Sequence, residues 1–152
     1  MNKIKIYLDN CCYNRPFDDL SQDKINQEAK AVQIIINLSK NGKIVIASSQ
    51  FVKYEIDSIK VKEKRDKVLD FYHCDEYYVL NNRISKLAKY YQTFNLKTFD
   101  SLHLAAAETN GIDYLLTTDI DFIKYSLRFE HKVKVINPCD FIKEELGNAT
   151  ES

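Results

Sequence analysis

Residues 98–119 read TFDSLHLAAAETNGIDYLLTTD, a helix signal followed at once by a strand signal. Thr98 is a natural helix N-cap, and Phe99, Leu102 and Ala106 fall at the spacing of one buried helical stripe. Gly111 marks the end of that helix. The segment 113–117 is then nearly continuous in apolar residues, as buried parallel strands are. The pattern predicts a helix over 99–110 that returns the chain into a parallel sheet.

The same alternation of strands and helices runs through the rest of the chain. Strands are expected at 4–8, 43–47, 77–80 and 133–136, the last one at a sheet edge. Helices are expected over 22–40, after the capping residues Ser48 and Ser49, through 60–72, and around 84–91. The alternation predicts an α/β fold, a three-layer αβα sandwich with a central, mostly parallel sheet. This domain spans residues 1–146, and residues 147–152 are expected to form a flexible tail.

The composition excludes several classes of protein. The chain has 152 residues, 45% of them apolar, and its 22 basic residues balance 22 acidic ones. This balance argues against a strongly basic nucleic-acid coat, and no apolar run approaches the roughly 18 residues of a membrane span. The start of the chain is too charged for a signal peptide, so a cytoplasmic protein without a membrane partner is expected. The four cysteines form no Cys-x-x-Cys pair, which argues against zinc.

Acidic residues fall where the predicted strands end. Asp9 follows the first strand, and Asp119 follows the strand near 114–118, with Asp121 two residues further on. Parallel strands end at the same edge of a sheet. Glu55 lies at the border of a buried helix face, and Asp100 lies in the first turn of another helix. Clustered carboxylates without a basic partner demand a cation, and oxygen ligands suit Mg²⁺ or Mn²⁺. The residues alone leave two interpretations open, a hard-metal site for phosphate-ester chemistry and ordinary capping or surface acids.

Three sequence blocks carry a family resemblance. They are YLDNCCYNRPFDD at 7–19, SSQFVKYEI at 48–56, and FDSLHLAAA at 99–107 followed by YLLTTD at 114–119. In order and spacing they resemble the PIN-domain family, close to the VapC-type toxins of prokaryotic toxin–antitoxin pairs. The resemblance covers residues 1 to about 146.

This resemblance implies a PIN-like fold and a metal-dependent endoribonuclease with Mg²⁺ or Mn²⁺ as cofactor. Such an enzyme hydrolyses RNA phosphodiester bonds with metal-activated water, leaving 5′-phosphate and 3′-hydroxyl ends. The family's catalytic acids match Asp9, Glu55, Asp100 and Asp119. Asp9, Asp100 and Asp119 are the expected metal ligands, joined by Glu55 directly or through water and by Asp121 as an auxiliary ligand. The implied partners are an RNA substrate, a small antitoxin protein and a second copy in a homodimer.

Several other residues are candidates for support of this site. Thr117 matches the family's hydroxyl residue two positions before the last acid. Many PIN domains place Ser or Thr directly after the first Asp, whereas Asn10 and Cys11 follow it here; Asn10 can still hydrogen-bond a carboxylate or water. His103 is interpreted mainly as a packing residue with one hydrogen bond, and alternatively as a residue that orients Asp100 or moves a proton.

Arg15 has two interpretations of equal weight. It can contact a substrate phosphate, because Arg suits bidentate phosphate recognition. Alternatively, it is a structural tie to an acid such as Asp18, Asp19 or Glu28.

Two rival functions remain open at this stage. A catalytically inactive PIN module could bind RNA or protein, although the four matching acids count against this alternative. A phosphoryl-transfer or receiver-like domain also places Asp after its first strand. The corresponding phosphatases show Asp-x-Asp there, and Cys11 occupies the second position in this chain.

Overall fold

The computed structural model describes residues 3–147 and centres on a five-stranded sheet. Its strands are β1 (Lys5–Leu8), β2 (Val45–Ser49), β3 (Glu76–Tyr78), β4 (Tyr114–Leu116) and β5 (Lys134–Ile136). They lie in the order β3-β2-β1-β4-β5, and every pairing is parallel. The predicted αβα class is therefore confirmed, with β5 at an edge as expected. The predicted tail, 147–152, lies outside the described residues apart from Gly147.

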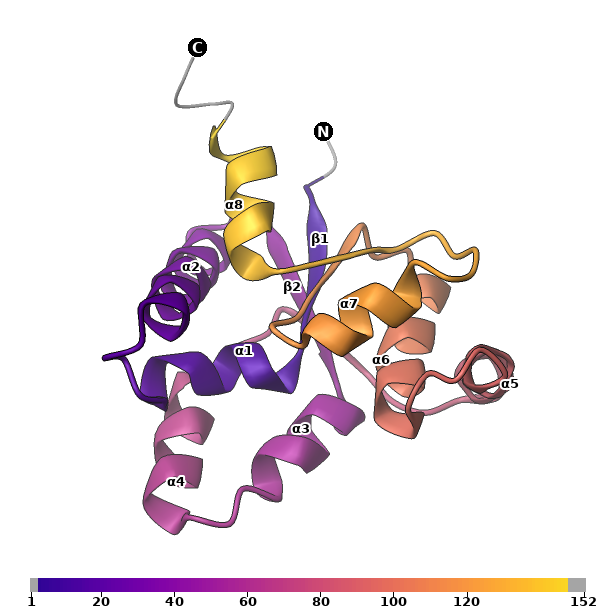
Figure 1. Cartoon of the computed structure of the whole chain (residues 1–152), viewed down its shortest axis with the longest axis horizontal. Helices are drawn as coiled ribbons and strands as arrows, with labels where there is room; N and C mark the ends of the chain where they lie inside the picture. Colours follow the sequence, from indigo (N-terminus) through magenta and orange to yellow (C-terminus); the bar gives the residue numbers. More distant parts are fainter. Residues whose placement is uncertain (1–2, 148–152) are drawn as a thin grey trace.

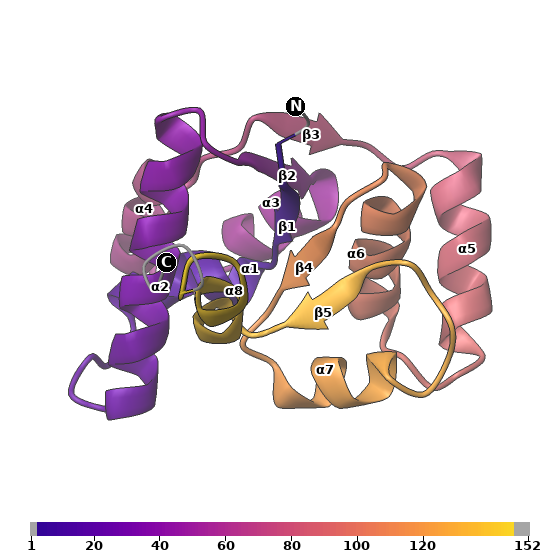
Figure 2. The same cartoon turned by 90° about the horizontal axis from the view of Figure 1, so that it is seen from above.

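Helices cover both faces of the sheet and crowd the carboxyl ends of its strands. They are α1 (Asn10–Asn14), the 3-10 helix η1 (Arg15–Phe17), α2 (Asp23–Lys40), α3 (Gln50–Asp57), α4 (Lys62–Phe71), α5 (Asn82–Gln92), α6 (Thr98–Thr109), α7 (Ile120–Ser126) and α8 (Pro138–Glu145). Figure 2 shows α2 and α8 on one face of the sheet and α5 and α6 on the other. In Figure 1, α1, α3, α6 and α7 surround the lower end of β1, where its carboxyl end lies. Within residues 3–147, no helix combines the length and apolar character needed to cross a bilayer.

The central strand β1 is buried on both of its faces. The sequence pattern predicts an apolar face with Ile6 and Leu8, and it places Tyr7 between them on the other side. In the structure all three side chains are fully buried, because helices cover both sides of the sheet. A buried tyrosine needs a partner for its hydroxyl. Tyr7 therefore brings a polar group into the core.

Helix starts show where local patterns suffice and where they fail. Ser49 caps α3 as expected, since its Oγ accepts hydrogen bonds from the backbone N–H groups of Phe51 at 3.2 Å and Val52 at 3.3 Å. The prediction that Thr98 caps α6 is wrong. Thr98 is the first residue of that helix, and extended Lys97 precedes it without a side-chain cap. The sequence patterns did not predict α1, α7 or α8, which are too short for helical periodicity to stand out.

Candidate metal centre

Two acids meet where the central strands end. Leu8 of β1 pairs with Leu116 of β4, and the backbone N–H of Asp9 donates to the Leu116 carbonyl at 3.0 Å. Asp9 then caps α1, with Oδ1 accepting from the backbone N–H of Asn10 at 2.7 Å. Asp119 caps α7 three residues beyond β4. The structure thus places both acids at one edge of the sheet, each at the start of a helix.

One threonine hydroxyl connects these two acids. Oγ1 of Thr117 donates to Oδ2 of Asp9 at 2.8 Å and accepts from the backbone N–H of Asp119 at 3.1 Å. The thiol of Cys11 lies 3.5 Å from the same Asp9 oxygen and 3.4 Å from the threonine hydroxyl. It also accepts from the backbone N–H of Thr118 at 3.3 Å. The position of Asp9 is therefore fixed from several sides.

Asp119 uses only one of its carboxylate oxygens to cap α7. Oδ1 accepts from the backbone N–H groups of Asp121 at 2.9 Å and Phe122 at 3.2 Å. Oδ2 accepts no hydrogen bond from the residues that the structure describes. Asp121 itself is exposed and reaches Asp119 through its backbone rather than through its carboxylate. Asp119 can therefore offer an oxygen to a ligand while it caps the helix.

Glu55 and His103 extend the cluster from the neighbouring helices. His103 on α6 is fully buried, and its Nε2 lies 2.6 Å from Oε1 of Glu55 on α3 and 3.5 Å from Oδ1 of Asp9. Asp9, Glu55 and His103 each offer one ligand atom, and these atoms all lie within 4.8 Å of one another. This spacing suits a single metal ion, which His103 could bind only after Nε2 gives up the proton that it donates to Glu55. The interpretation of His103 as a packing residue with one hydrogen bond missed this arrangement.

Two successive buried hydrogen bonds support His103 through its other ring nitrogen, Nδ1. Its Nδ1 lies 2.7 Å from the hydroxyl of Tyr7, which in turn lies 2.5 Å from Oγ of Ser49. All three side chains are fully buried. A carboxylate only accepts hydrogen bonds, so Nε2 of the imidazole donates to Glu55 and Nδ1 exchanges a hydrogen bond with Tyr7. These hydrogen bonds connect β1, β2 and α6 to Glu55 on α3.

The electrostatics of the cluster is dominated by unneutralised negative charge. Burial raises the pKa of Asp100 to about 7, and the nearby carboxylates of Asp9, Asp119 and Glu55 add to the rise against the lowering effect of His103. The pKa of His103 is raised as well: burial lowers it, but the attraction of Asp9 and Glu55 outweighs that effect.

No lysine or arginine among residues 3–147 forms an ion pair with any of these four acids. Their negative charge exceeds what one imidazole can neutralise, and carboxylate oxygens are the donors that hard divalent cations prefer. The donor set therefore fits a divalent metal ion.

Arg15 and Asn10 are engaged by the protein itself. Nε of Arg15 lies 2.8 Å from Glu28, which is only 1% exposed, and NH1 lies 2.7 Å from Asp18. Nδ2 of Asn137 donates to the other Glu28 oxygen at 2.6 Å. The structure thus places Arg15 in the structural tie that the sequence left as one of two alternatives. Asn10 accepts from the Asn14 amide at 2.9 Å through its side chain.

Comparisons with known proteins support the fold. No family model matches the sequence, and no curated protein matches it significantly. A chain in the crystal structure of VapBC2 from Rickettsia felis, bound to a promoter DNA fragment, is similar to this chain with a TM-score of 0.57 and 15% identity. The match covers 87% of this chain and 98% of that one. PAE2754 from Pyrobaculum aerophilum is similar with a TM-score of 0.51 and 13% identity, covering 95% and 96%.

These likenesses confirm the PIN-like fold that the sequence blocks implied. At such low identity they extend to the fold alone.

Proposed function

We propose that this protein is a metal-dependent endoribonuclease that uses Mg²⁺ or Mn²⁺ and acts in the cytoplasm as the toxin of a toxin–antitoxin pair. The observation that carries the proposal is the group of Asp9 after β1, Glu55 on α3 and His103 on α6, whose ligand atoms lie within 4.8 Å of one another. Asp100 and Asp119 lie near this group, since Asp9, Asp119 and Glu55 all raise the pKa of Asp100. No lysine or arginine of the described residues forms an ion pair with these acids. The fold shared with the VapBC2 chain supports the toxin assignment by analogy.

The metal ion would be held by the carboxylates of Asp9, Asp100 and Asp119, with Glu55 bound directly or through water. These oxygen donors suit Mg²⁺ or Mn²⁺ better than zinc. When bound, such an ion stabilises charge on a phosphodiester and increases the acidity of a coordinated water. Asp121 is the second residue of α7, two positions after Asp119, and we retain it as an auxiliary ligand.

The role of the remaining residues is to hold these carboxylates in place. The Asn10 backbone N–H and the Thr117 hydroxyl fix the two oxygens of Asp9. His103 fixes Glu55, and the cap of α7 fixes Asp119. Such supporting hydrogen bonds reduce the reorganisation that metal binding requires. We assign Arg15 a supporting role of a different kind, because its ion pair with Glu28 holds η1 against α2.

Calorimetric titration of Mn²⁺ into the purified protein tests the site without knowledge of the substrate. We expect micromolar to millimolar binding that is lost in Asp9→Asn and retained in Asp57→Asn. Asp57 is an exposed acid on α3 that pairs with Lys53 at 3.0 Å, which makes it a matched control. Equal binding by wild type and Asp9→Asn would reject the proposed site.

RNA cleavage with added Mn²⁺ tests the chemistry. We expect 5′-phosphate and 3′-hydroxyl ends from the wild type and a loss of at least about a hundredfold in Asp9→Asn. Metal binding without any cleavage would instead support the alternative of a binding module that has lost catalysis.

We extend the proposal to two protein partners, a small antitoxin that covers the acidic edge and a second copy of this chain. Light scattering of the purified chain tests the homodimer. Co-expression with the product of an adjacent gene, followed by the cleavage assay, tests the antitoxin. A monomer that is active in the presence of every co-expressed neighbour would contradict both assignments.

A further inference from the structure

An aromatic ledge lies beside the acid cluster. It consists of Tyr54 on α3 and Phe99 on α6, whose rings stack with 5.6 Å between their centroids and 13° between their planes. Phe99 is half-buried, whereas Tyr54 is 61% exposed. One face of the Tyr54 ring therefore rests on Phe99, and the side chain remains largely open to solvent.

The ledge is attached to the same two helices that carry the helix-borne acids. Tyr54 directly precedes Glu55, and Phe99 directly precedes Asp100. The ring of Phe99 also lies 6.4 Å from the ring of His103, which hydrogen-bonds to Glu55 at 2.6 Å. Figure 1 shows α3 and the lower end of α6 together near the carboxyl end of β1. The ledge is thus connected to Glu55 through the ring contact between Phe99 and His103.

We propose that the aromatic ledge is a binding subsite on which one unpaired nucleobase of the RNA stacks. This inference rests on the proposed function for the phosphate at the acids, but the stacking itself does not depend on catalysis. A nucleotide joins a flat ring to a phosphate, and the ledge joins a flat ring to a candidate phosphate-binding metal centre.

Stacking explains why the base must be unpaired. A base on an aromatic side chain needs a free face, which unstacked bases of single strands offer and paired, stacked bases of a duplex do not. Every base has such a face, so the ledge recognises single-stranded character rather than one sequence.

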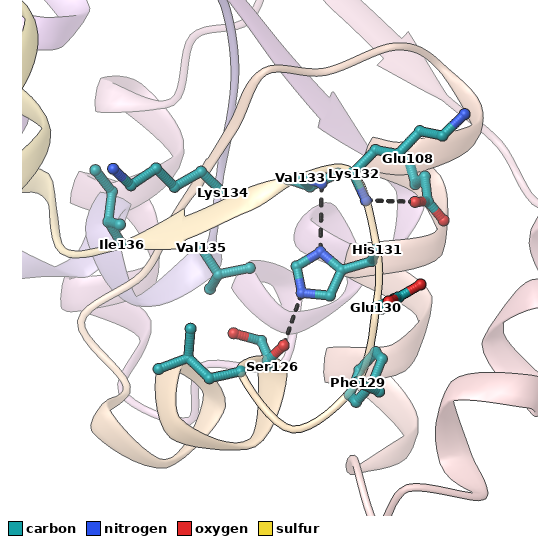
Figure 3. A pocket seen from close by; sticks show the side chains of 11 residues that line it. Glu108, Ser126, Phe129, Glu130, His131, Lys132, Val133, Lys134, Val135 and Ile136 are labelled. Carbon is teal, nitrogen blue, oxygen red and sulfur yellow. Dashed lines mark hydrogen bonds between the residues drawn. The ribbon is translucent and has the colours of Figure 1, made fainter.

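A second region with aromatic residues lacks this combination. A cavity of about 660 Å³ lies between β5 and the end of α7, with Phe129 and His131 in its wall. Figure 3 shows both His131 nitrogens engaged, by the Ser126 carbonyl at 2.7 Å and the Val133 backbone N–H at 3.3 Å. The Glu108 carboxylate in the same wall accepts from the backbone N–H of Lys132 at 2.6 Å. These polar groups are satisfied within the protein, so the cavity offers no comparable ligand site.

Binding measurements on substitutions of Tyr54 test the ledge. The probes are a fluorescein-labelled 12-nucleotide oligouridylate and a 12-base-pair RNA duplex, followed by fluorescence anisotropy with Ca²⁺ in place of Mg²⁺. Gel analysis verifies that the probes stay intact. Tyr54→Leu keeps apolar area but removes the aromatic face, whereas Tyr54→Phe keeps the face. Tyr90→Leu is the control, because Tyr90 is 55% exposed on α5 and meets Phe94 edge-on.

We expect Tyr54→Leu to raise the Kd for oligouridylate by about five- to a hundredfold, the range for one lost base–aromatic stack. Tyr54→Phe and Tyr90→Leu should stay within about twofold of wild type, and no variant should change duplex binding. Unchanged oligouridylate binding by Tyr54→Leu would overturn the inference, as would an equal loss of duplex binding. So would dissociation of a dimer by Tyr54→Leu without an effect on RNA.

The two proposals can fail separately. If Tyr54→Leu binds and cleaves RNA with Mn²⁺ as the wild type does, the ledge is refuted and the nuclease assignment stands. If no preparation cleaves RNA but Tyr54→Leu still loses oligouridylate binding, the ledge stands and the nuclease assignment falls.

Discussion

Replacing Asp100 by Asn should stabilise the metal-free protein at alkaline pH. Burial and the neighbouring carboxylates raise the pKa of Asp100 from 3.8 to about 7. The folded state therefore binds this proton more tightly than the unfolded state does. Between about pH 4 and about pH 7 the folded protein holds a proton that the unfolded chain has released, so the free energy of unfolding falls as pH rises. Above pH 7 the ionised carboxylate destabilises the fold fully.

The size of the effect follows from this shift. A difference of about three pH units corresponds to about 4 kcal/mol. Because Asp100 is only half-buried, solvent screening reduces this to about 2 kcal/mol. Asn keeps the shape of the side chain and removes its charge. Asp100→Asn should therefore gain about 2 kcal/mol at pH 8, which raises Tm by about 4–8 °C for a chain of this size. The gain should shrink below pH 7 and approach zero near pH 4.

Thermal unfolding followed by circular dichroism, in EDTA and across this pH range, measures the gain. Asp57→Asn removes an exposed acid at the end of α3 that pairs with Lys53 and should leave Tm nearly unchanged, which makes it the control. Added Mn²⁺ should stabilise the wild type and leave Asp100→Asn unaffected. A variant that is no more stable than wild type at pH 8, or whose gain is the same at every pH, would refute the electrostatic reasoning.

Three further substitutions probe the supporting contacts. Tyr7→Phe removes the hydroxyl that links His103 to β2. It should lower the free energy of unfolding in urea by about 1–3 kcal/mol and weaken Mn²⁺ binding. The control Tyr13→Phe, which loses another buried hydroxyl hydrogen bond, should lower stability without changing the affinity for Mn²⁺. Arg15→Ala leaves the carboxylate of Glu28 buried without its cation and should cost about 3–5 kcal/mol; a loss below about 1 kcal/mol in the same assay would argue against a structural tie. Thr117→Val keeps the shape of the side chain but removes the hydroxyl that donates to Asp9 and accepts from the backbone N–H of Asp119. Calorimetry should therefore show weaker Mn²⁺ binding, and an unchanged affinity would exclude this supporting role.

The sequence was most informative about the order of elements and the ends of strands. Strands read as apolar runs, and parallel strands end at one edge of a sheet, so the convergence of Asp9 and Asp119 follows from a local pattern and one topological rule. Ser49 could be predicted as a cap because its hydrogen bonds reach only two and three residues along the chain. Such signals are contained in short stretches of sequence.

Contacts between distant segments could not be derived in this way. His103 meets the Tyr7 hydroxyl across 96 positions, and nothing near either residue specifies the other. The available signal was a tyrosine in a strand that turned out to be buried on both faces, which requires a polar partner. Arg15 likewise had two equal interpretations, and the choice depended on the burial of Glu28 in α2.

The position of β1 in the middle of the sheet also determines when, during synthesis, the acid cluster can form. Strand β1 pairs on one side with β2 and on the other with β4, which is synthesised more than a hundred residues after it. Asp9 consequently waits for almost the whole chain before Asp100 and Asp119 can join it. A nascent or prematurely terminated polypeptide that stops before β4 contains Asp9, Glu55 and Asp100 but lacks Asp119 and the strand that pairs with this side of β1. If the finished protein cuts RNA, such an incomplete copy lacks one of the proposed metal ligands and would not cut.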